Sequence, residues 1–187
     1  MTKKQTPHKF RGLEVDPHHD HIQGPANAPV TLMEYGDYQC PYCGAAYPIA
    51  KQIQRRFGDN LCFVFRNFPL AQIHPDAEVA AEAAEAAAAQ NKFWEMHDYL
   101  YEHQDALTPP QLIAAAKLLG LDVERFTDDL RRHAYAERVR EDFLSGVRAG
   151  VNGTPTFFIN AVRHDGSWDF DTLSEAINTE LKQRIAA

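Results

Sequence analysis

Three consecutive segments between residues 30 and 65 predict a β-strand, an α-helix and a second β-strand. Residues 30–35 are β-branched and apolar and end at a Gly-Asp turn. Residues 41–57 carry apolar side chains at helical spacing and are followed by Gly58, a residue type that commonly ends a helix. Residues 61–65 form an unbroken apolar run, typical of a strand buried on both faces. A strand, a helix and a strand in this order make a βαβ unit, so we expect the two strands to be parallel.

A helical block follows this unit, because the chain becomes rich in Ala, Glu, Leu and Arg and loses its β-branched clusters. At least three helices are predicted. The first covers residues 76–90 and is continued or followed by residues 93–101. The second begins at Thr108, which with Gln111 makes a capping box, and ends at Gly120; the third begins near Asp122 and continues to Val147.

After Gly150 the pattern returns to strands. Residues 156–159 predict a strand, followed by a tight turn and a short partner strand that ends at His164. Residues 170–185 predict a final helix with apolar residues along one face. The order βαβ, helices, ββα predicts an α/β fold: a four-stranded mixed sheet with helices on both faces and an inserted all-helical subdomain.

The length and composition agree with one domain that carries such an insertion. The chain has 187 residues and 44% apolar content, which is enough to bury a full core. We expect an extended or partly disordered N-terminal segment over residues 1–28. The sheet domain is expected over residues 29–75 and 150–187, and the helical insertion over residues 76–149.

The charge and hydropathy patterns argue against two classes of partner. The net charge of −7 gives no general attraction to nucleic acid or to an anionic membrane surface. No stretch approaches the ~20 consecutive apolar residues of a membrane-spanning helix. The polar N-terminal residues do not resemble a secretory signal, so we expect a cytoplasmic protein, or a periplasmic or exported one if the chain is a processed form.

Two of the three cysteines, Cys40 and Cys43, are separated by only two residues and lie where the first strand has ended and the first helix begins. A helix N-terminus presents free N–H groups and a positive dipole end, which favour a thiolate. We therefore expect Cys40 to be the exposed, activated nucleophile. Cys43 lies one turn below, within disulfide reach, and is expected to be the buried resolving thiol. Pro41 suits the first helical position.

Two other interpretations of this pair remain. A Cys-x-x-Cys can be half of a zinc site, but zinc needs two further Cys or His ligands. Cys62 stands alone in an apolar strand, where we expect it to be buried and inert, and no His pair lies at a suitable distance downstream. The pair can also be purely structural. We predict no metal site, and no cofactor other than the redox-active disulfide itself.

The chain resembles the DsbA-like branch of the thioredoxin superfamily from Gly24 to the last helix. Four segments carry the resemblance: 33–43 with its Cys-Pro-Tyr-Cys sequence, Phe68-Pro69 with His74-Pro75, the Lys-Phe-Trp-Glu-Met-His segment 92–97, and Gly-Thr-Pro-Thr at 153–156. The resemblance implies a thioredoxin-like fold with a helical insertion, and a thiol-disulfide oxidoreductase.

The resemblance also implies roles for further residues. In the family the proline matching Pro155 follows a cis peptide bond, and with Thr154 it would hold an extended substrate backbone beside Cys40. Pro41 and Tyr42 are the other expected substrate-binding residues. The family commonly keeps a buried acid where Glu34 stands, which implies that Glu34 relays the Cys43 proton. The alternative is that Glu34 faces solvent on an edge strand.

The predicted activity is disulfide exchange with protein or small-thiol substrates. Glutathione is a small thiol that can act as co-substrate in such an exchange. The pair can oxidise, reduce or isomerise disulfides, because direction depends on potential, compartment and redox partners. The strongest oxidants of the branch have His where Tyr42 stands, so we expect a middling potential. A glutathione-dependent transferase or isomerase and a non-catalytic peptide-binding or chaperone-like module are the alternatives. Retention of both cysteines argues against these two.

A group of histidines and acids precedes the first strand: Asp16, His18, His19, Asp20 and His21. Such a cluster can bind a transition metal adventitiously, but it predicts a polar, solvated segment. His97 and His103 are expected to pack or to lie at the surface of the helical block. Trp94 is expected in its core.

Overall fold

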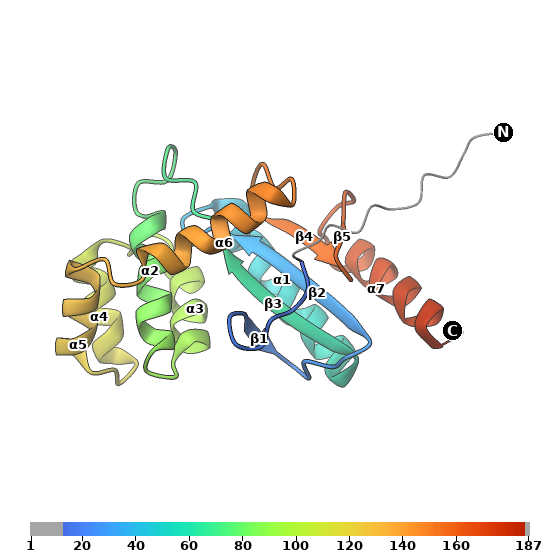
Figure 1. The fold of residues 1–187 in the computed structure, drawn as a ribbon, viewed down its shortest axis with the longest axis horizontal. Helices are drawn as coiled ribbons and strands as arrows, with labels where there is room; N and C mark the ends of the chain where they lie inside the picture. The colour runs from blue at the N-terminus through green and yellow to red at the C-terminus, as the bar shows by residue number, and fades with distance from the viewer. Residues whose placement is uncertain (1–12, 186–187) are drawn as a thin grey trace.

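The five strands in the described part of the chain, residues 13–185, form one mixed sheet in the computed structural model (Figure 1). The strands are β1 (His21–Gln23), β2 (Val30–Gly36), β3 (Leu61–Asn67), β4 (Thr156–Ile159) and β5 (Val162–Arg163). The helices are α1 (Pro41–Phe57), α2 (Ala77–Ala88), α3 (Phe93–Glu102), α4 (Pro109–Leu118), α5 (Val123–Arg131), α6 (Ala136–Arg148) and α7 (Phe170–Ile185). The predicted bounds of α1 and α7 are confirmed.

The sheet has the strand order β1-β3-β2-β4-β5, which places β2 at its centre. β2 and β3 are parallel, as the βαβ pattern predicts, and β4 and β5 form an antiparallel pair. β4 runs antiparallel to β2 and joins the two halves of the chain. Because β2 and β3 are parallel, their carboxyl ends meet at one edge of the sheet, and the N-terminal end of β4 lies at the same edge. The Cys-x-x-Cys segment follows β2 at that edge.

Both faces of the sheet are buried. Successive side chains of a strand point to opposite faces, and each face packs into its own apolar layer. Leu32, Phe63 and Phe157 pack on the layer that includes α1 and α7. On the opposite face the sheet packs against residues from the N-terminal segment and from the region around α6, in a cluster with these members: Leu13, Met33, Tyr35, Cys62, Val64, Phe68, Ala149, Val151 and Phe158. Cys62 is fully buried, as predicted, and burial raises its pKa to about 11.

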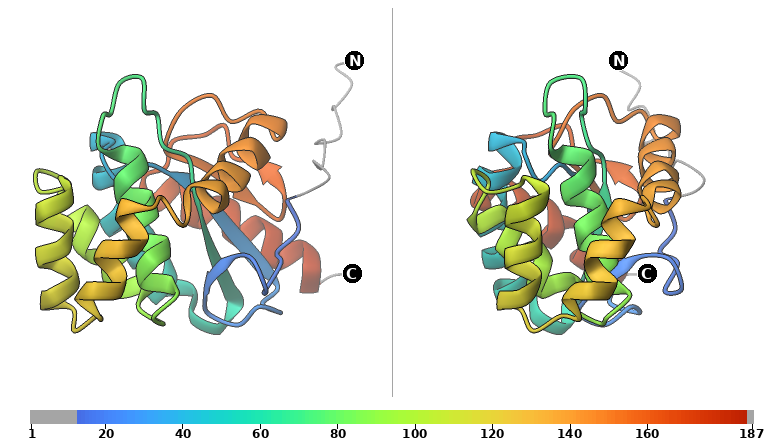
Figure 2. Two further views of the ribbon diagram at one scale, coloured as in Figure 1. Left: turned by 60° about the vertical axis from the view of Figure 1, so that its left-hand side comes forward. Right: turned by 90° about the vertical axis from the view of Figure 1, so that its left-hand side faces the viewer.

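The helical insertion extends to one side of the sheet, with α4 and α5 farthest from it (Figures 1 and 2). The capping box of Thr108 and Gln111 is present at the start of α4. The single helix predicted from Asp122 to Val147 is wrong: the chain breaks between α5 and α6, where His133 has a φ of +51°. No glycine or proline marks this break. The left-handed turn is accompanied by a contact between the His133 Nδ1 and the Glu82 carboxylate at 3.1 Å.

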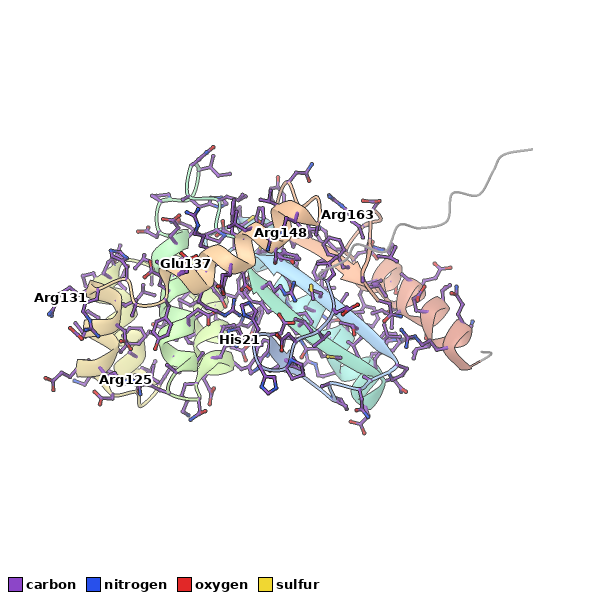
Figure 3. The ribbon with its side chains drawn as sticks, in the orientation of Figure 1. His21, Arg125, Arg131, Glu137, Arg148 and Arg163 are labelled. Atoms are coloured by element: carbon purple, nitrogen blue, oxygen red, sulfur yellow. The ribbon has the colours of Figure 1, made fainter. Side chains whose placement is uncertain are left out.

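The description of residues 1–28 as an extended or partly disordered segment needs correction within the described range. Residues 21–23 form β1, which pairs antiparallel with β3 and adds a fifth strand to the four predicted. His21 stacks on the Phe93 ring with centroids 3.4 Å apart and contacts Glu85 at 2.9 Å. Figure 3 shows His21 where the sheet meets the helical insertion. Residues 1–12 lie outside the described residues.

The histidine and acid cluster is therefore only partly solvated: Asp16 and His18 are exposed, whereas Asp20 is buried. β3 is two residues longer than predicted, and its last two residues also have buried partners. Arg66 and Asn67, at the end of β3, are polar but buried. The Arg66 guanidinium donates to both Asp20 oxygens, at 2.7 and 2.9 Å. The backbone N–H of Asn67 donates to the Asp142 carboxylate at 3.0 Å. Buried partners from the N-terminal segment and from α6 thus allow polar residues to continue an interior strand.

Candidate functional site

The turn between β2 and α1 holds the two cysteines. Cys40 is the N-cap residue of α1, and Pro41 occupies the first turn. The Cys40 thiol lies 3.4 Å from the backbone carbonyl oxygen of Thr154, to which it donates. Cys43, one turn on, accepts from the backbone N–H of Asp37 at 3.5 Å. The expectation that Cys40 is exposed is wrong: 3% of its surface is accessible, and Cys43 is fully buried as predicted.

The two thiols have opposite acidities. A hydrogen bond from the Cys43 thiol lowers the pKa of Cys40 to about 5, and the Thr154 side chain and the N–H groups of Cys43 and Tyr42 act in the same direction, against burial. Those N–H groups are the free donors of the helix N-terminus. Burial raises the pKa of Cys43 well above its usual value, as do Cys40 and the negative charge of Glu34. At neutral pH the site therefore holds one thiolate and one thiol.

The Thr154 hydroxyl is placed to serve the thiolate. Its Oγ1 atom is buried and has no hydrogen-bond partner among residues 13–185, so it is free to donate once the Cys40 thiol has lost its proton. The peptide bond between Thr154 and Pro155 is cis. Pro155, the residue after this threonine, is half-buried. Tyr42, two residues after Cys40, is 67% exposed.

Glu34 is buried, which excludes the alternative that it faces solvent on an edge strand. It belongs to β2, which has β3 on one side and β4 on the other. It has the same strand parity as Leu32, so it faces the layer that contains α1 and Cys43. Its Oε1 atom has no hydrogen-bond partner among the described residues. Burial, followed by the negative charge of Cys40, raises the pKa of Glu34 to about 8.

Replacing Glu34 with glutamine is expected to change how stability depends on pH. The folded-state pKa of Glu34, about 8, exceeds the ordinary value of 4.5. Between these values the folded protein holds a proton that the unfolded chain has lost, so ionisation destabilises the fold as pH rises. Relative to Glu34→Gln, the free energy of unfolding should fall by up to about 1.4 kcal/mol per pH unit in this window. Urea unfolding of both reduced proteins across the window measures this. Parallel pH profiles would contradict the assignment.

Gln104, in the loop after α3, is a site residue that the sequence reasoning missed. Its Nε2 donates to the backbone carbonyls of Tyr38 and Cys40, at 2.8 and 2.9 Å. Its amide also lies against Gly44, where a Cβ atom would collide with it. The helical insertion therefore holds the cysteine turn directly. A lone glutamine in a loop gives no sequence signal for this contact.

Replacing Gln104 with alanine is expected to lower the free energy of unfolding by about 1–2 kcal/mol, because two hydrogen bonds are lost. Loosening of the turn should also raise the pKa of Cys40, since the N–H groups that stabilise its thiolate depend on the geometry of this turn. Urea unfolding and the thiolate absorbance as a function of pH measure the two effects. Gln72→Ala, at an exposed position, is the matched control. An unchanged Cys40 pKa in Gln104→Ala would show that Gln104 does not act on the cysteine.

Asp37 is a second residue that the sequence reasoning did not select. Its buried carboxylate accepts from the N–H groups of Gln39 and Leu70, both at 2.8 Å, and contacts the His74 Nδ1 at 2.8 Å. Asp37 thereby ties the cysteine turn to the loop that follows β3.

His97 packs in the interior and does not lie at the surface, which were its two predicted positions. Its Nδ1 is 3.0 Å from the Tyr38 hydroxyl.

Two further features are absent from residues 13–185: a cluster of metal ligands and a helix that could cross a membrane. No group of three or more His, Cys, Asp or Glu side chains in this range is arranged to hold a metal ion. Among the helices of the same range, none combines the length and apolar character that a membrane crossing needs.

Curated relatives match nearly the whole chain. The Na(+)/H(+) antiporter NhaA 1 of Salinispora arenicola is 48% identical over 167 residues, which are 89% of this chain and 26% of that protein. The Na(+)/H(+) antiporter NhaA 3 of Salinispora tropica is 46% identical over 165 residues, 88% of this chain and 25% of that protein. This chain thus spans about a quarter of the length of the curated relatives it matches.

Solved structures share the fold. Oxidised BdbD from Bacillus subtilis superposes with a TM-score of 0.81 at 29% identity, covering 89% of this chain and 95% of that one. A thioredoxin-like oxidoreductase from Silicibacter pomeroyi gives a TM-score of 0.80 at 26% identity, covering 91% and 96%. Wolbachia pipientis α-DsbA1 shows the same fold, with a TM-score of 0.81 at 20% identity over 93% and 96% of the two chains.

A family model described as Thioredoxin matches residues 17–179, which include β1, the cysteine turn, the helical insertion and most of α7. With the sheet order and the solved structures, this match identifies the fold without ambiguity. The chain belongs to the thioredoxin family and has its DsbA-like form.

Proposed function

We propose that this protein is a thiol-disulfide oxidoreductase that exchanges disulfides with protein substrates through Cys40 and Cys43. The observation that carries the proposal is the contrast between the two thiols: the pKa of Cys40 is lowered to about 5, while that of Cys43 is raised well above its usual value. Disulfide exchange needs one thiolate that attacks and one thiol that waits. A glutathione-dependent transferase needs only the first of these.

The reaction in the reducing direction has two steps. The Cys40 thiolate attacks a substrate disulfide, one substrate sulfur leaves as a thiolate, and a mixed disulfide forms. The Cys43 thiol then gives up its proton and attacks the Cys40 sulfur, which releases the second substrate thiolate and forms the Cys40–Cys43 disulfide. Two electrons pass from the protein to the substrate. The same steps in reverse oxidise a substrate dithiol.

Glu34 is the proposed acceptor of the Cys43 proton. The two groups interact electrostatically in the buried layer between β2 and α1. The negative charge of Cys40, which helps to raise the Glu34 pKa to about 8, is lost when Cys40 enters the mixed disulfide, so at that stage Glu34 ionises more readily and can take the Cys43 proton. Pro41 and Tyr42 are exposed and follow Cys40 directly in the sequence. Thr154 contacts the Cys40 thiol from another loop, and Pro155 follows it; both are half-buried. We propose that these four residues contact the substrate.

Stoichiometric oxidation of a dithiol peptide tests the function. The oxidised protein, mixed with the peptide in the absence of other oxidants, should consume two peptide thiols and yield two protein thiols per molecule. Mass spectrometry after alkylation counts both. If peptide thiols persist while the protein keeps its disulfide over a full range of peptide concentrations, the protein is not an oxidoreductase for dithiols.

A further inference from the structure

An exposed asparagine stands directly before a glycine in the loop that leads to Thr154. Asn152 is exposed, and Gly153 lies outside any helix or strand. This is the one Asn-Gly pair in the sequence. Asparagine is a chemically labile residue type, because the backbone nitrogen of the next residue can attack its side-chain amide. A glycine in the next position favours this attack, since it has no side chain to restrict the backbone or to shield the nitrogen.

Both reacting groups of the pair are free within residues 13–185. The backbone N–H of Gly153 makes no hydrogen bond in this range, and a Cβ atom placed on Gly153 would have open space around it. The Nδ2 atom of Asn152, which would leave as ammonia, likewise has no partner among these residues. No hydrogen bond in this part of the chain therefore has to break before the Gly153 nitrogen approaches the Asn152 Cγ atom.

Arg163 polarises the amide that is attacked. Its guanidinium, labelled in Figure 3, donates to the Asn152 Oδ1 atom at 3.2 Å. The same guanidinium donates to the Gly150 carbonyl and pairs with Asp165 at 3.0 Å, so several contacts hold it in place. Negative charge develops on Oδ1 when the backbone nitrogen attacks Cγ. A guanidinium that is already bonded to this oxygen stabilises that charge.

Asn160, the residue after β4, has the opposite arrangement. Its Oδ1 accepts from the Thr31 N–H at 3.0 Å, and its Nδ2 donates to the Glu180 carboxylate at 2.9 Å. The next residue is Ala161, which carries a side chain. Both ends of this amide are held, so Asn160 should resist the reaction. It lies with Asn152 in the tryptic peptide 149–163 and serves as an internal control.

We propose that Asn152 is a site of spontaneous modification, where the Gly153 nitrogen attacks the Asn152 side chain and the pair becomes a succinimide and then an aspartate or isoaspartate. In the first step a bond forms between Cγ and the Gly153 nitrogen, whose proton passes to solvent. Nδ2 takes up a proton and leaves as ammonia. Water then adds to one of the two ring carbonyls and opens the ring. No electrons are transferred, so the reaction does not depend on disulfide exchange.

The isoaspartate product lengthens the loop that contacts Cys40. In isoaspartate the main chain runs through Cβ and Cγ, which adds one carbon, about 1.5 Å of chain, between residues 152 and 153. Val151 is buried just before the pair, and Thr156 begins β4 just after it. Because both ends of the segment are fixed, the added length displaces the residues between them, which include Thr154.

Displacement of Thr154 removes support from the Cys40 thiolate. The Thr154 side chain is one of the groups that lower the pKa of Cys40. The new carboxylate also adds a negative charge two residues from Thr154, a span of at most about 7 Å. Loss of a donor and gain of a negative charge both disfavour a thiolate. The modified protein should therefore have a higher Cys40 pKa than the fresh protein.

Incubation of the reduced protein at mildly alkaline pH and body temperature tests the modification. Peptide mapping by mass spectrometry, with digestion at mildly acidic pH to stop the reaction, should show conversion of the amide to an acid at Asn152 and an intact Asn160. Labelling with an isoaspartyl methyltransferase should detect isoaspartate in the incubated protein. An Asn152 that persists as long as Asn160 overturns the proposal.

A pair of variants tests the role of Arg163. Arg163→Gln should slow the appearance of isoaspartate in the intact protein about threefold, because one charge-assisted hydrogen bond to the developing charge is lost. Arg148→Gln, at an exposed arginine near the same loop in sequence, is the control and should leave the rate unchanged. Equal rates for the two variants would overturn the activation by Arg163.

The thiolate absorbance as a function of pH tests the link to Cys40. Incubation should raise the Cys40 pKa of the unaltered protein. Asn152→Gln, incubated in parallel, should keep the low value, because the longer side chain would have to form a larger ring. Asn152→Asp carries the new charge without the longer backbone and should give a smaller rise. An isoaspartate form that keeps the Cys40 pKa at about 5 would overturn the link.

Discussion

Replacing Cys40 with serine is expected to lower the rate of disulfide exchange by at least about three orders of magnitude, because serine has no sulfur atom with which to form the mixed disulfide. The pKa of Cys40 is lowered to about 5, so the unaltered protein presents a thiolate. Stopped-flow measurement of the reaction with a disulfide peptide gives the rate constant for both proteins.

The Cys43→Ser variant is expected to fail at the second step instead. Its Cys40 still attacks a substrate disulfide, but no resolving thiol follows, so the mixed disulfide accumulates and is visible by mass spectrometry. Cys62→Ala is the control, because Cys62 is buried in β3 on the sheet face opposite the α1 layer. A mixed disulfide on Cys43 in the Cys40→Ser protein, formed at the normal rate, would reverse the assigned roles.

Replacing Asp20 with alanine is expected to lower the free energy of unfolding by about 3–5 kcal/mol, because it removes a buried ion pair and its two charge-assisted hydrogen bonds. Asp20 accepts two hydrogen bonds from the Arg66 guanidinium, at 2.7 and 2.9 Å, and both residues are buried. Arg66 keeps its bond to the Tyr35 hydroxyl in the variant, but the ion pair is lost.

Urea unfolding of the oxidised protein measures this loss. Asp165→Asn is the matched control, because Asp165 also pairs with an arginine, Arg163, but is 81% exposed. A surface pair of this kind contributes less than about 1 kcal/mol. Equal effects of the two substitutions would mean that the N-terminal segment is not anchored to the sheet through Arg66.

The fold was predictable where local patterns and burial agree. The segments that became β2, α1 and α7 have strong periodicity and clear ends, such as Gly58 after α1, and their bounds or types are confirmed. The prediction failed where polar residues are buried by distant partners. In the sequence, Arg66 and Asn67 look like polar residues at which a strand ends. In the structure they continue the strand, because they bond to Asp20 and Asp142, which are 46 and 75 residues away along the chain. The break at His133 has no glycine or proline to announce it.

In the functional site, too, the residues set by local sequence were predictable and those set by distant packing were not. Cys40 and Cys43 were predictable because their spacing and their place at the start of a helix are local features. The low exposure of Cys40 was not, because it arises when the turn packs against the Thr154 loop, more than a hundred residues later in the chain. Gln104 was missed for the same reason: its contacts with Tyr38 and Cys40 depend on how the insertion packs on the sheet domain.

The reduction potential of the Cys40–Cys43 pair tests the central claim most directly. The protein is equilibrated with glutathione buffers of graded ratio, its free thiols are alkylated, and the reduced fraction is counted by mass spectrometry. We predict one two-electron transition with a potential between those of thioredoxin, about −270 mV, and of DsbA, about −120 mV. The transition should vanish in both Cys40→Ser and Cys43→Ser. A pair that stays reduced in every buffer, or a transition that survives either substitution, would contradict a redox role for these two cysteines.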